Sequence, residues 1–420
     1  MSSKTFRGMV ACTCVLAISS WLNAAEVSSA NTSQLTSQRA LAALVREVLN
    51  SNPAVQAAQA AVNAAQARER AASRPLYNPA LAFNLEQSAE DTQALGLDQT
   101  IDWADKREAR TKVASYVWVA TRAKLVTVRQ RLSGELLSAL VRLQTARALA
   151  RLAQRRADGT QHLAALSQQR YQAGDLNQVS LELARLAHAQ AKLQRAQAVS
   201  DVIQARRALA AVAGDVDRNW PGLPKRLPTL ARGAPDLKTL LNELPVLRAQ
   251  RARIAAARSA VELSARRRTP DPTIGLRGGS QENEALIGIG LSLPLFVRNN
   301  FSAEVDVANA NLIRTQRRAQ NIYRRAKARL VSALMQYRVT RRARLAWEQT
   351  GQRSVSTQID LLRRLWQAGE LSTTDFLVQL NQALNTQASA IGVRGRAWRA
   401  WFEWLTASGR IDDWLGLRRP

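Results

Sequence analysis

The chain contains 420 residues, enough for about two or three ordinary domains or one elongated protein. Hydrophobic residues make up 46% of it and aromatic residues only 5%, while glycine and proline number 19 and 12. Because alanine, leucine, arginine and glutamine favour helices, this composition predicts a mostly helical fold and excludes a collagenous or disulfide-stapled chain.

The 60 Lys and Arg residues outnumber 32 Asp and Glu, giving a net charge of +28 that first suggests a polyanionic partner. The N-terminal residues argue against a nucleic-acid partner, because they predict that the protein is exported. Lys4 and Arg7 precede an apolar run over 9–18 and then small residues ending at Ala25, which predicts a secretory signal peptide over 1–25. The run is too short to span a membrane. Export weakens the case for nucleic acid, and we expect no nucleic-acid partner.

The two cysteines, Cys12 and Cys14, lie inside the apolar run of the predicted signal peptide. The mature chain would therefore contain neither disulfides nor thiolate metal ligands. A lipoprotein needs its cysteine just after such a run, so no lipid anchor is expected.

An internal repeat organises the rest of the chain. The segment Tyr-Gln-Ala-Gly-Asp-Leu from Tyr171 returns as Trp-Gln-Ala-Gly-Glu-Leu from Trp366, and Asn78-Pro79 returns as Asp271-Pro272. The copies lie about 190 residues apart. Two copies of one unit therefore fill the mature chain.

Each copy begins with an Ala-rich helix and continues with two strands. Apolar residues at helical spacing predict the helices over 41–72 and 237–268, which Pro75 and Pro270 end. Alternation with period two then predicts two hairpins, over about 79–102 and about 272–296. Their strands are expected at 80–86, 94–101, 273–278 and 286–293. The loops between them are polar and acidic.

A long helical hairpin completes each copy, over about 104–213 and about 299–406. No proline interrupts 104–170 or 299–365, and apolar residues there recur every three or four positions. The glycine-containing turns follow, and helices return over 181–213 and 375–406.

The predicted organisation is a signal peptide, two repeats, a Pro-rich crossover and a tail, over 1–25, 26–213, 214–236, 237–406 and 407–420. The crossover cannot continue a helix and is expected to pack beside the helices. Aromatic residues near the C-terminus are expected to pack in a core or an interface: Trp398, Trp401, Phe402, Trp404 and Trp414.

Catalytic and metal-binding patterns are missing from the sequence. His162 and His188 have no neighbouring ligand set, and Met335 is the single methionine outside the signal peptide. No Walker A loop, dinucleotide fingerprint or Gly-x-Ser-x-Gly elbow occurs. We therefore predict no enzyme, and no catalytic, cofactor-binding or metal-binding residue.

Four strands are too few to close a membrane barrel, for which about eight is the lower limit. An open sheet edge in lipid is forbidden, so strands that enter a membrane would have to be pooled by several chains. Three copies would provide 12 strands. A small periplasmic sheet packed on helices is the alternative, and the bare pattern leaves both open.

The signal peptide, the doubled element order, the two glycine turns and the segment from Gln99 to Arg107 resemble TolC-type outer-membrane efflux proteins. The branch that works with heavy-metal resistance pumps is the most similar, and the resemblance covers nearly the whole mature chain. It implies a homotrimer with a 12-stranded β-barrel in outer-membrane lipid and a long α-helical coiled-coil barrel crossing the periplasm. It also implies two partners, a periplasmic adaptor and an inner-membrane pump of the resistance-nodulation-division type.

By the same resemblance, the two glycine turns form periplasmic tips where the tunnel closes and the adaptor makes contact. The corresponding residues are Tyr171, Gly174, Ser180, Trp366, Gly369 and Asp375. Where the family often carries Asp, Arg and Asp, this chain has Ser180, Leu371 and Val378. Ordinary turn chemistry also explains these positions, since both glycines would supply positive φ and Asp375 would cap the returning helix.

The predicted function is a passive conduit in a tripartite efflux system, exporting heavy-metal cations or other toxic compounds across the periplasm and outer membrane. We expect much of the excess positive charge on outer or interface faces. Two alternatives remain. One is an exported Arg-rich coiled-coil adaptor or structural protein without a barrel, and the other is a polyanion-binding helical protein with steeply salt-dependent binding.

Overall fold

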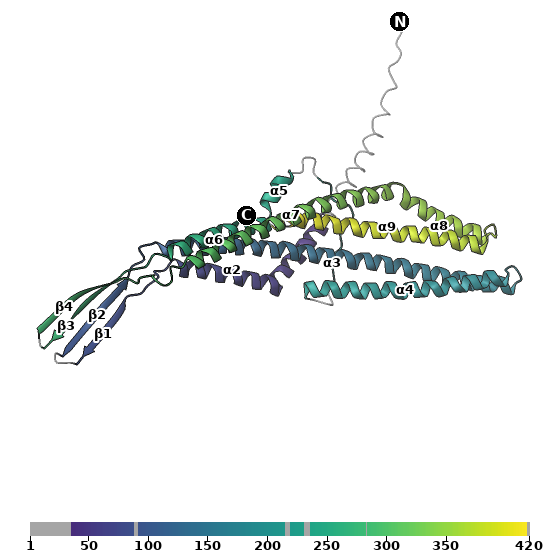
Figure 1. The fold of residues 1–420 in the computed structure, drawn as a ribbon. Helices are drawn as coiled ribbons and strands as arrows, with labels where there is room; N and C mark the ends of the chain where they lie inside the picture. The colour runs from purple at the N-terminus through teal and green to yellow at the C-terminus, as the bar shows by residue number, and fades with distance from the viewer. Residues whose placement is uncertain (1–34, 88–90, 215–218, 231–235, 283, 418–420) are drawn as a thin grey trace, which may run out of the picture. The chain divides into compact units, whose positions relative to one another are not determined.

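The computed structural model describes residues 35–87, 91–214, 219–230, 236–282 and 284–417 (Figure 1). They form long helices and one four-stranded sheet, as the sequence predicts. The predicted signal peptide lies outside the described residues. Two compact units are present, one from the described parts of Met1–Asn50, Leu132–Ala234 and Ser332–Pro420, and one from Ser51–Arg131 and Pro235–Val331. Each unit therefore draws on both sequence repeats.

The first helix of each repeat is broken, which corrects the prediction of one continuous helix. A helix over 35–51 ends before α2 (Pro53–Ala72), and α5 (Leu237–Glu243) ends before α6 (Pro245–Arg266). Pro53 and Pro245 each stand at the start of the second helix. Proline fits there because the N–H that it lacks has no partner within the helix.

The four strands form one antiparallel sheet in the order β1-β2-β3-β4. They are β1 (Ala80–Glu86), β2 (Thr92–Thr100), β3 (Thr273–Gln281) and β4 (Glu284–Ser292). The β2–β3 pairing, in which Gly96 lies opposite Arg277, joins the two repeats. Strands β3 and β4 extend further towards their turn than the sequence predicts. The strands β1 and β4 form the two edges of the sheet.

The first long helix is continuous, whereas its counterpart is interrupted. α3 (Lys106–Gln172) runs for 67 residues. α7 (Ser302–Ala346) leads through a π-helical turn, η1 (Trp347–Gly351), into α8 (Gln352–Gln367). The unbroken helix predicted over 299–365 is therefore wrong at this turn. The Trp347 ring packs so closely on Gly351 that a side chain on that glycine would clash with it.

Two return helices, α4 (Gln178–Ala213) and α9 (Thr373–Ala407), complete the helical hairpins. α9 crosses α3 closely at two points, where Gly134 lies against Thr406 and Gly395 against Thr145. The predicted C-terminal tail contains a further helix, α10 (Ile411–Leu415), with both terminal residues buried. The predicted packing of the C-terminal aromatic residues is confirmed, since Trp398 and Phe402 are fully buried and Trp414 contacts Trp401 and Phe402.

The described part of the crossover is irregular and packs beside the helices, as predicted. Gln144 of α3 donates a hydrogen bond to the Pro221 carbonyl over 2.6 Å, and Tyr337 of α7 donates one to the Pro228 carbonyl. Among the described helices, none combines the length and apolar character needed to cross a membrane.

Candidate functional site

The two faces of the sheet differ sharply in chemistry. Pairing places the side chains of Phe83, Leu95 and Leu276 on one face, which we call the apolar face. This face lies open, and Ile287 there is 86% exposed. Its large hydrophobic members are Leu81, Phe83, Leu85, Leu95, Leu97, Ile274, Leu276, Ile287, Ile289 and Leu291. A soluble monomer rarely exposes so large an apolar patch, which indicates contact with lipid or with another chain.

The opposite face, which we call the polar face, carries small and charged residues. Its charged members are Glu86, Asp98, Arg277 and Glu284. Glycines occupy much of the remainder, namely Gly96, Gly275, Gly279, Gly288 and Gly290. An apolar face opposite a polar one is the pattern of a membrane barrel strand, with lipid outside and water inside.

A buried ion pair lies between the end of the strands and the start of the long helix. Lys106 Nζ lies 2.9 Å from Asp271 Oδ2, and both side chains are almost completely buried. The hydroxyl of Tyr77 donates to the same Asp271 oxygen over 2.7 Å, and this hydrogen bond, followed by burial, raises the pKa of Tyr77 to about 12. These contacts join both repeats within one unit, because Asp271 belongs to the second copy.

The segment from Gln99 to Arg107 provides the rest of this junction. Asp102 caps α3, since its two carboxylate oxygens accept hydrogen bonds from the backbone N–H groups of Lys106 and Arg107 over 2.8 and 2.7 Å. The exposed Trp103 donates its indole N–H to the Pro270 carbonyl over 2.7 Å. An amphipathic ring at this point suits a membrane interface.

Both hairpin turns have the backbone geometry expected from the sequence. Gly174 and Gly369 have φ of 82° and 80°, which confirms the expected positive φ. Each turn also repeats the same long hydrogen bond, from Asp175 N to Arg170 O over 2.8 Å and from Glu370 N to Leu365 O over 3.0 Å. This pattern is the Schellman motif, which satisfies the last carbonyls of a helix.

The helix caps at the tips correct one expectation. α4 is capped by Asn177, which accepts from the N–H of Ser180 over 2.8 Å. α9 is capped by Ser372, which accepts from the N–H of Asp375 over 3.1 Å and donates to its carboxylate over 2.7 Å. Asp375 is thus the third residue of α9 rather than its cap. Both residue types make good caps, so the sequence alone did not separate them.

The equivalent aromatic residues of the two tips differ in burial. Trp366 is only 4% exposed, stacks on Phe376 with ring centres 5.4 Å apart and donates its indole N–H to Thr373. Tyr171 is 40% exposed. A buried cluster from both hairpins surrounds Trp366, comprising Leu163, Ala184, Leu362, Trp366, Phe376 and Leu377. The two tips of one chain are therefore packed together.

Arg170, which the sequence analysis missed, also links the tips. Its guanidinium donates to the carbonyls of Trp366 and Gln367 over 3.3 and 2.7 Å, and it lies 5.0 Å from the centre of the Trp366 ring. A cation at these carbonyls complements the negative end of the α8 dipole. No residue pattern signals this contact, because it joins positions about 200 residues apart.

The extreme ends of the tips are acidic and exposed. The carboxylates of Asp175, Glu370 and Asp375 lie here, while Ser180 is half-buried. Val378 is exposed and Leu371 packs against the buried cluster. Because Ser180, Leu371 and Val378 are uncharged, the charge near the turns comes from these carboxylates together with Arg170 and the exposed Arg364.

A stripe of α4 stays uncovered along its length. Its members are apolar yet exposed: Val179, Leu186, Leu193, Val199 and Ile203. The first three recur every seven residues, the spacing of a coiled-coil seam. The face of α4 that packs within the chain includes Leu181, Ala184 and Ala191 instead. We call the uncovered set the α4 stripe.

The comparisons with known proteins agree with this geometry. The family model described as "Outer membrane efflux protein" matches residues 44–215 and again residues 237–410. The chain belongs to the outer membrane efflux protein family. The two matches correspond to the two repeats that the sequence predicts.

One relative is similar over most of its length. It is the cobalt-zinc-cadmium resistance protein CzcC of Cupriavidus metallidurans, which is 25% identical over 337 residues, 78% of this chain and 80% of that protein. The solved structure of VceC from Vibrio cholerae is 20% identical, with a TM-score of 0.73 over 88% of this chain and 96% of that one. The structure of CusC is 16% identical, with a TM-score of 0.74 over 88% and 92%.

Members of the outer membrane efflux protein family are channels rather than enzymes. The protein is therefore an outer-membrane efflux channel that extends into the periplasm and serves tripartite systems. Within the described residues, no group of His, Cys, Asp and Glu has the arrangement of a metal site. His162 is exposed and His188 half-buried, with a long 3.5 Å contact to Thr160.

Proposed function

We propose that the protein acts as a homotrimer in which three four-stranded sheets close one 12-stranded barrel in the outer membrane. The observation that carries this proposal is the sheet itself, which has an exposed apolar face and two edges, β1 and β4. Lipid offers no hydrogen-bond partners to such edges, so pairing with other copies is the physical solution.

The α4 stripe supports the same assembly in the periplasmic part. Leu193 is 73% exposed in the single chain, and its seven-residue spacing with Leu186 and Val179 suits packing against a helix of another copy. Helices joined in this way would form the walls of a water-filled tunnel. The energy for transport would come from an inner-membrane pump, reached through a periplasmic adaptor at the acidic tips.

We propose divalent heavy-metal cations as the cargo. The similarity to the cobalt-zinc-cadmium resistance protein supports this choice. The charge of the polar face also favours cations, because it carries the carboxylates of Glu86, Asp98 and Glu284 against the single guanidinium of Arg277. Rings of carboxylates draw cations into a pore.

The assembly is tested by outer-membrane fractionation, gels of unheated and heated sample, and the mass of the detergent-solubilised protein. We expect outer-membrane recovery and three times the mass of the mature chain. The double variant Leu186→Asp with Leu193→Asp should yield monomers, whereas Lys192→Asp, an equal change of charge at an exposed position off this seam, should leave the trimer intact. A soluble periplasmic monomer from the unaltered chain would instead favour the coiled-coil adaptor without a barrel.

The cargo is tested in a host strain that lacks the gene. We expect greater sensitivity to zinc, cobalt and cadmium salts, restored by the intact gene, with unchanged sensitivity to organic toxicants. Sensitivity to organic compounds alone would overturn the metal assignment while leaving the channel in place.

A further inference from the structure

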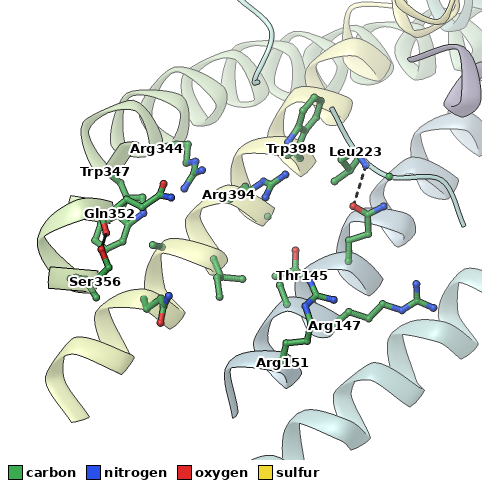
Figure 2. Close-up of a pocket in the computed structure, with 18 residues that line it drawn as sticks. Thr145, Arg147, Arg151, Leu223, Arg344, Trp347, Gln352, Ser356, Arg394 and Trp398 are labelled. Carbon is green, nitrogen blue, oxygen red and sulfur yellow. Dashed lines mark hydrogen bonds between the residues drawn. The ribbon is translucent and has the colours of Figure 1, made fainter. Parts of the chain in front are cut away.

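A cavity of about 610 Å³ opens between α3 and the α7–α9 segment, within one compact unit. Figure 2 shows its arginines on three helices: Arg147 and Arg151 on α3, Arg344 on α7 and Arg394 on α9. The described lining contains four guanidinium groups and no carboxylate. Its size is that of a site for a small organic molecule.

The positive charge of this cavity is largely uncompensated. Arg344 pairs with Glu348 over 2.7 Å at the π-helical turn. Arg147, Arg151 and Arg394 have neither a hydrogen bond nor an ion pair among the described residues. Partial burial, and then the neighbouring Arg344, lower the pKa of Arg394, while Glu348 raises it. Such a cluster is destabilised until an anion enters it.

A buried hydrogen-bond donor without a partner in the described part of the chain also lies at this cavity. Trp398 lines the cavity and is fully buried, yet its indole N–H has no acceptor among the described residues. A buried donor without a partner is costly, and an indole nitrogen can only donate. The nitrogen itself has almost no accessible surface, so a ligand oxygen would reach it only after neighbouring side chains of the cavity shift.

Other polar groups around the cavity are already used within the protein. Thr145 donates to the Val141 carbonyl, and Gln144 donates to the Pro221 carbonyl. Gln144 also accepts from the N–H of Leu223, the bond that the dashed line at Leu223 marks in Figure 2. The side chains of Gln352 and Gln387 can donate or accept, whereas the three arginines without partners can only donate and carry positive charge. Guanidinium groups bind phosphate and carboxylate with paired hydrogen bonds.

We propose that this cavity binds a small oxyanion, a phosphate-bearing or dicarboxylate molecule of the periplasm. The anion would bridge Arg151 on α3 and Arg394 on α9, and so hold the first helical hairpin to the second. The π-helical turn shapes the far wall, since it places Trp347 at the cavity beside the Arg344–Glu348 pair. Single π turns often occur at functional sites.

The test is thermal unfolding and calorimetry of the purified full chain in detergent, with inorganic phosphate or succinate added at constant ionic strength against chloride. We expect the melting temperature to rise by about 2–4 °C and one anion to bind per chain. Comparing phosphate with succinate separates the two ligand sources. A melting temperature that neither anion raises would overturn the proposal, as would occupation of the cavity by carboxylates of a second copy.

Variants distinguish specific binding of the anion in the cavity from a general effect of salt on stability. Arg394→Gln should abolish the rise, and Arg151→Gln should do the same at an exposed position where folding is not at risk. Arg353→Gln is the matched control, because Arg353 is exposed on α8 and does not line the cavity. An equal rise in Arg151→Gln and in the unaltered protein would show ion exclusion from the surface rather than binding.

Discussion

The two hairpin tips arose from one repeated sequence motif, and they share a backbone but not a role for their aromatic residue. Gly174 and Gly369 have nearly the same φ, and the same long hydrogen bond closes each turn. Trp366, however, is buried between the hairpins, whereas Tyr171 faces solvent. Backbone geometry follows from the local motif, while side-chain burial depends on which neighbour each copy contacts.

The largest difference should appear when both aromatic residues are truncated. Trp366→Ala should lower the free energy of local unfolding at the tips by about 3–5 kcal/mol, because it removes a fully packed ring. Tyr171→Ala should change it by no more than about 0.5 kcal/mol. Hydrogen exchange of the α8 and α9 amides measures the first effect, and exchange of the α3 and α4 amides near their turn measures the second. Equal losses of stability in the two variants would contradict the difference in burial between Trp366 and Tyr171.

The two turn glycines should behave alike. Gly174→Ala and Gly369→Ala should each destabilise their hairpin by about 1–2 kcal/mol, because φ near 80° brings a Cβ too close to the following carbonyl. Nothing else lies near either position, so the strain is purely in the backbone. Proteolysis at each turn, compared between the two variants, measures the effect, and a large difference between them would contradict the shared geometry.

Removing Arg170 from α3 should affect the end of α8, to which it donates its hydrogen bonds. Arg170→Ala should cost about 1 kcal/mol and loosen the end of α8, since it removes two hydrogen bonds to the carbonyls there. We expect faster exchange in α8 and increased uptake of a large antibiotic through the channel. The exposed Arg363 on α8 supplies the control Arg363→Ala. Unchanged exchange in α8 would remove the proposed link.

The smallest expected effect comes from exchanging the third residue of the two return helices. Ser180→Asp should stabilise α4 by about 0.3–1 kcal/mol, because a carboxylate complements the positive end of the helix dipole. Asp375→Ser should weaken α9 by a similar amount and also removes the contact with Ser372. Exchange rates in the first turns measure both, and changes of the same sign would contradict this account.

Periodicity in the sequence predicted the strands and the long helices well. Apolar residues alternate along the strands and recur every three or four residues along the helices. Periodicity did not predict the breaks. Pro53 follows a helix whose apolar pattern continues past it, and the π-helical turn depends on how Trp347 packs against Gly351. The candidate site also contains features that the sequence predicted and features that it did not. Its turn glycines were predictable, whereas Arg170 and the buried state of Trp366 depend on contacts between the two copies.

The glycines of the polar face have a consequence for the width of the passage. In the proposed barrel, a solute at Gly288 would meet peptide groups rather than side chains, and the structure leaves open space where a side chain would stand. The largest solute that can pass would then depend on the absence of a side chain at this position of β4. A single bulky substitution there would act as a sieve, and relatives could differ in the size of their cargo without any change in the fold.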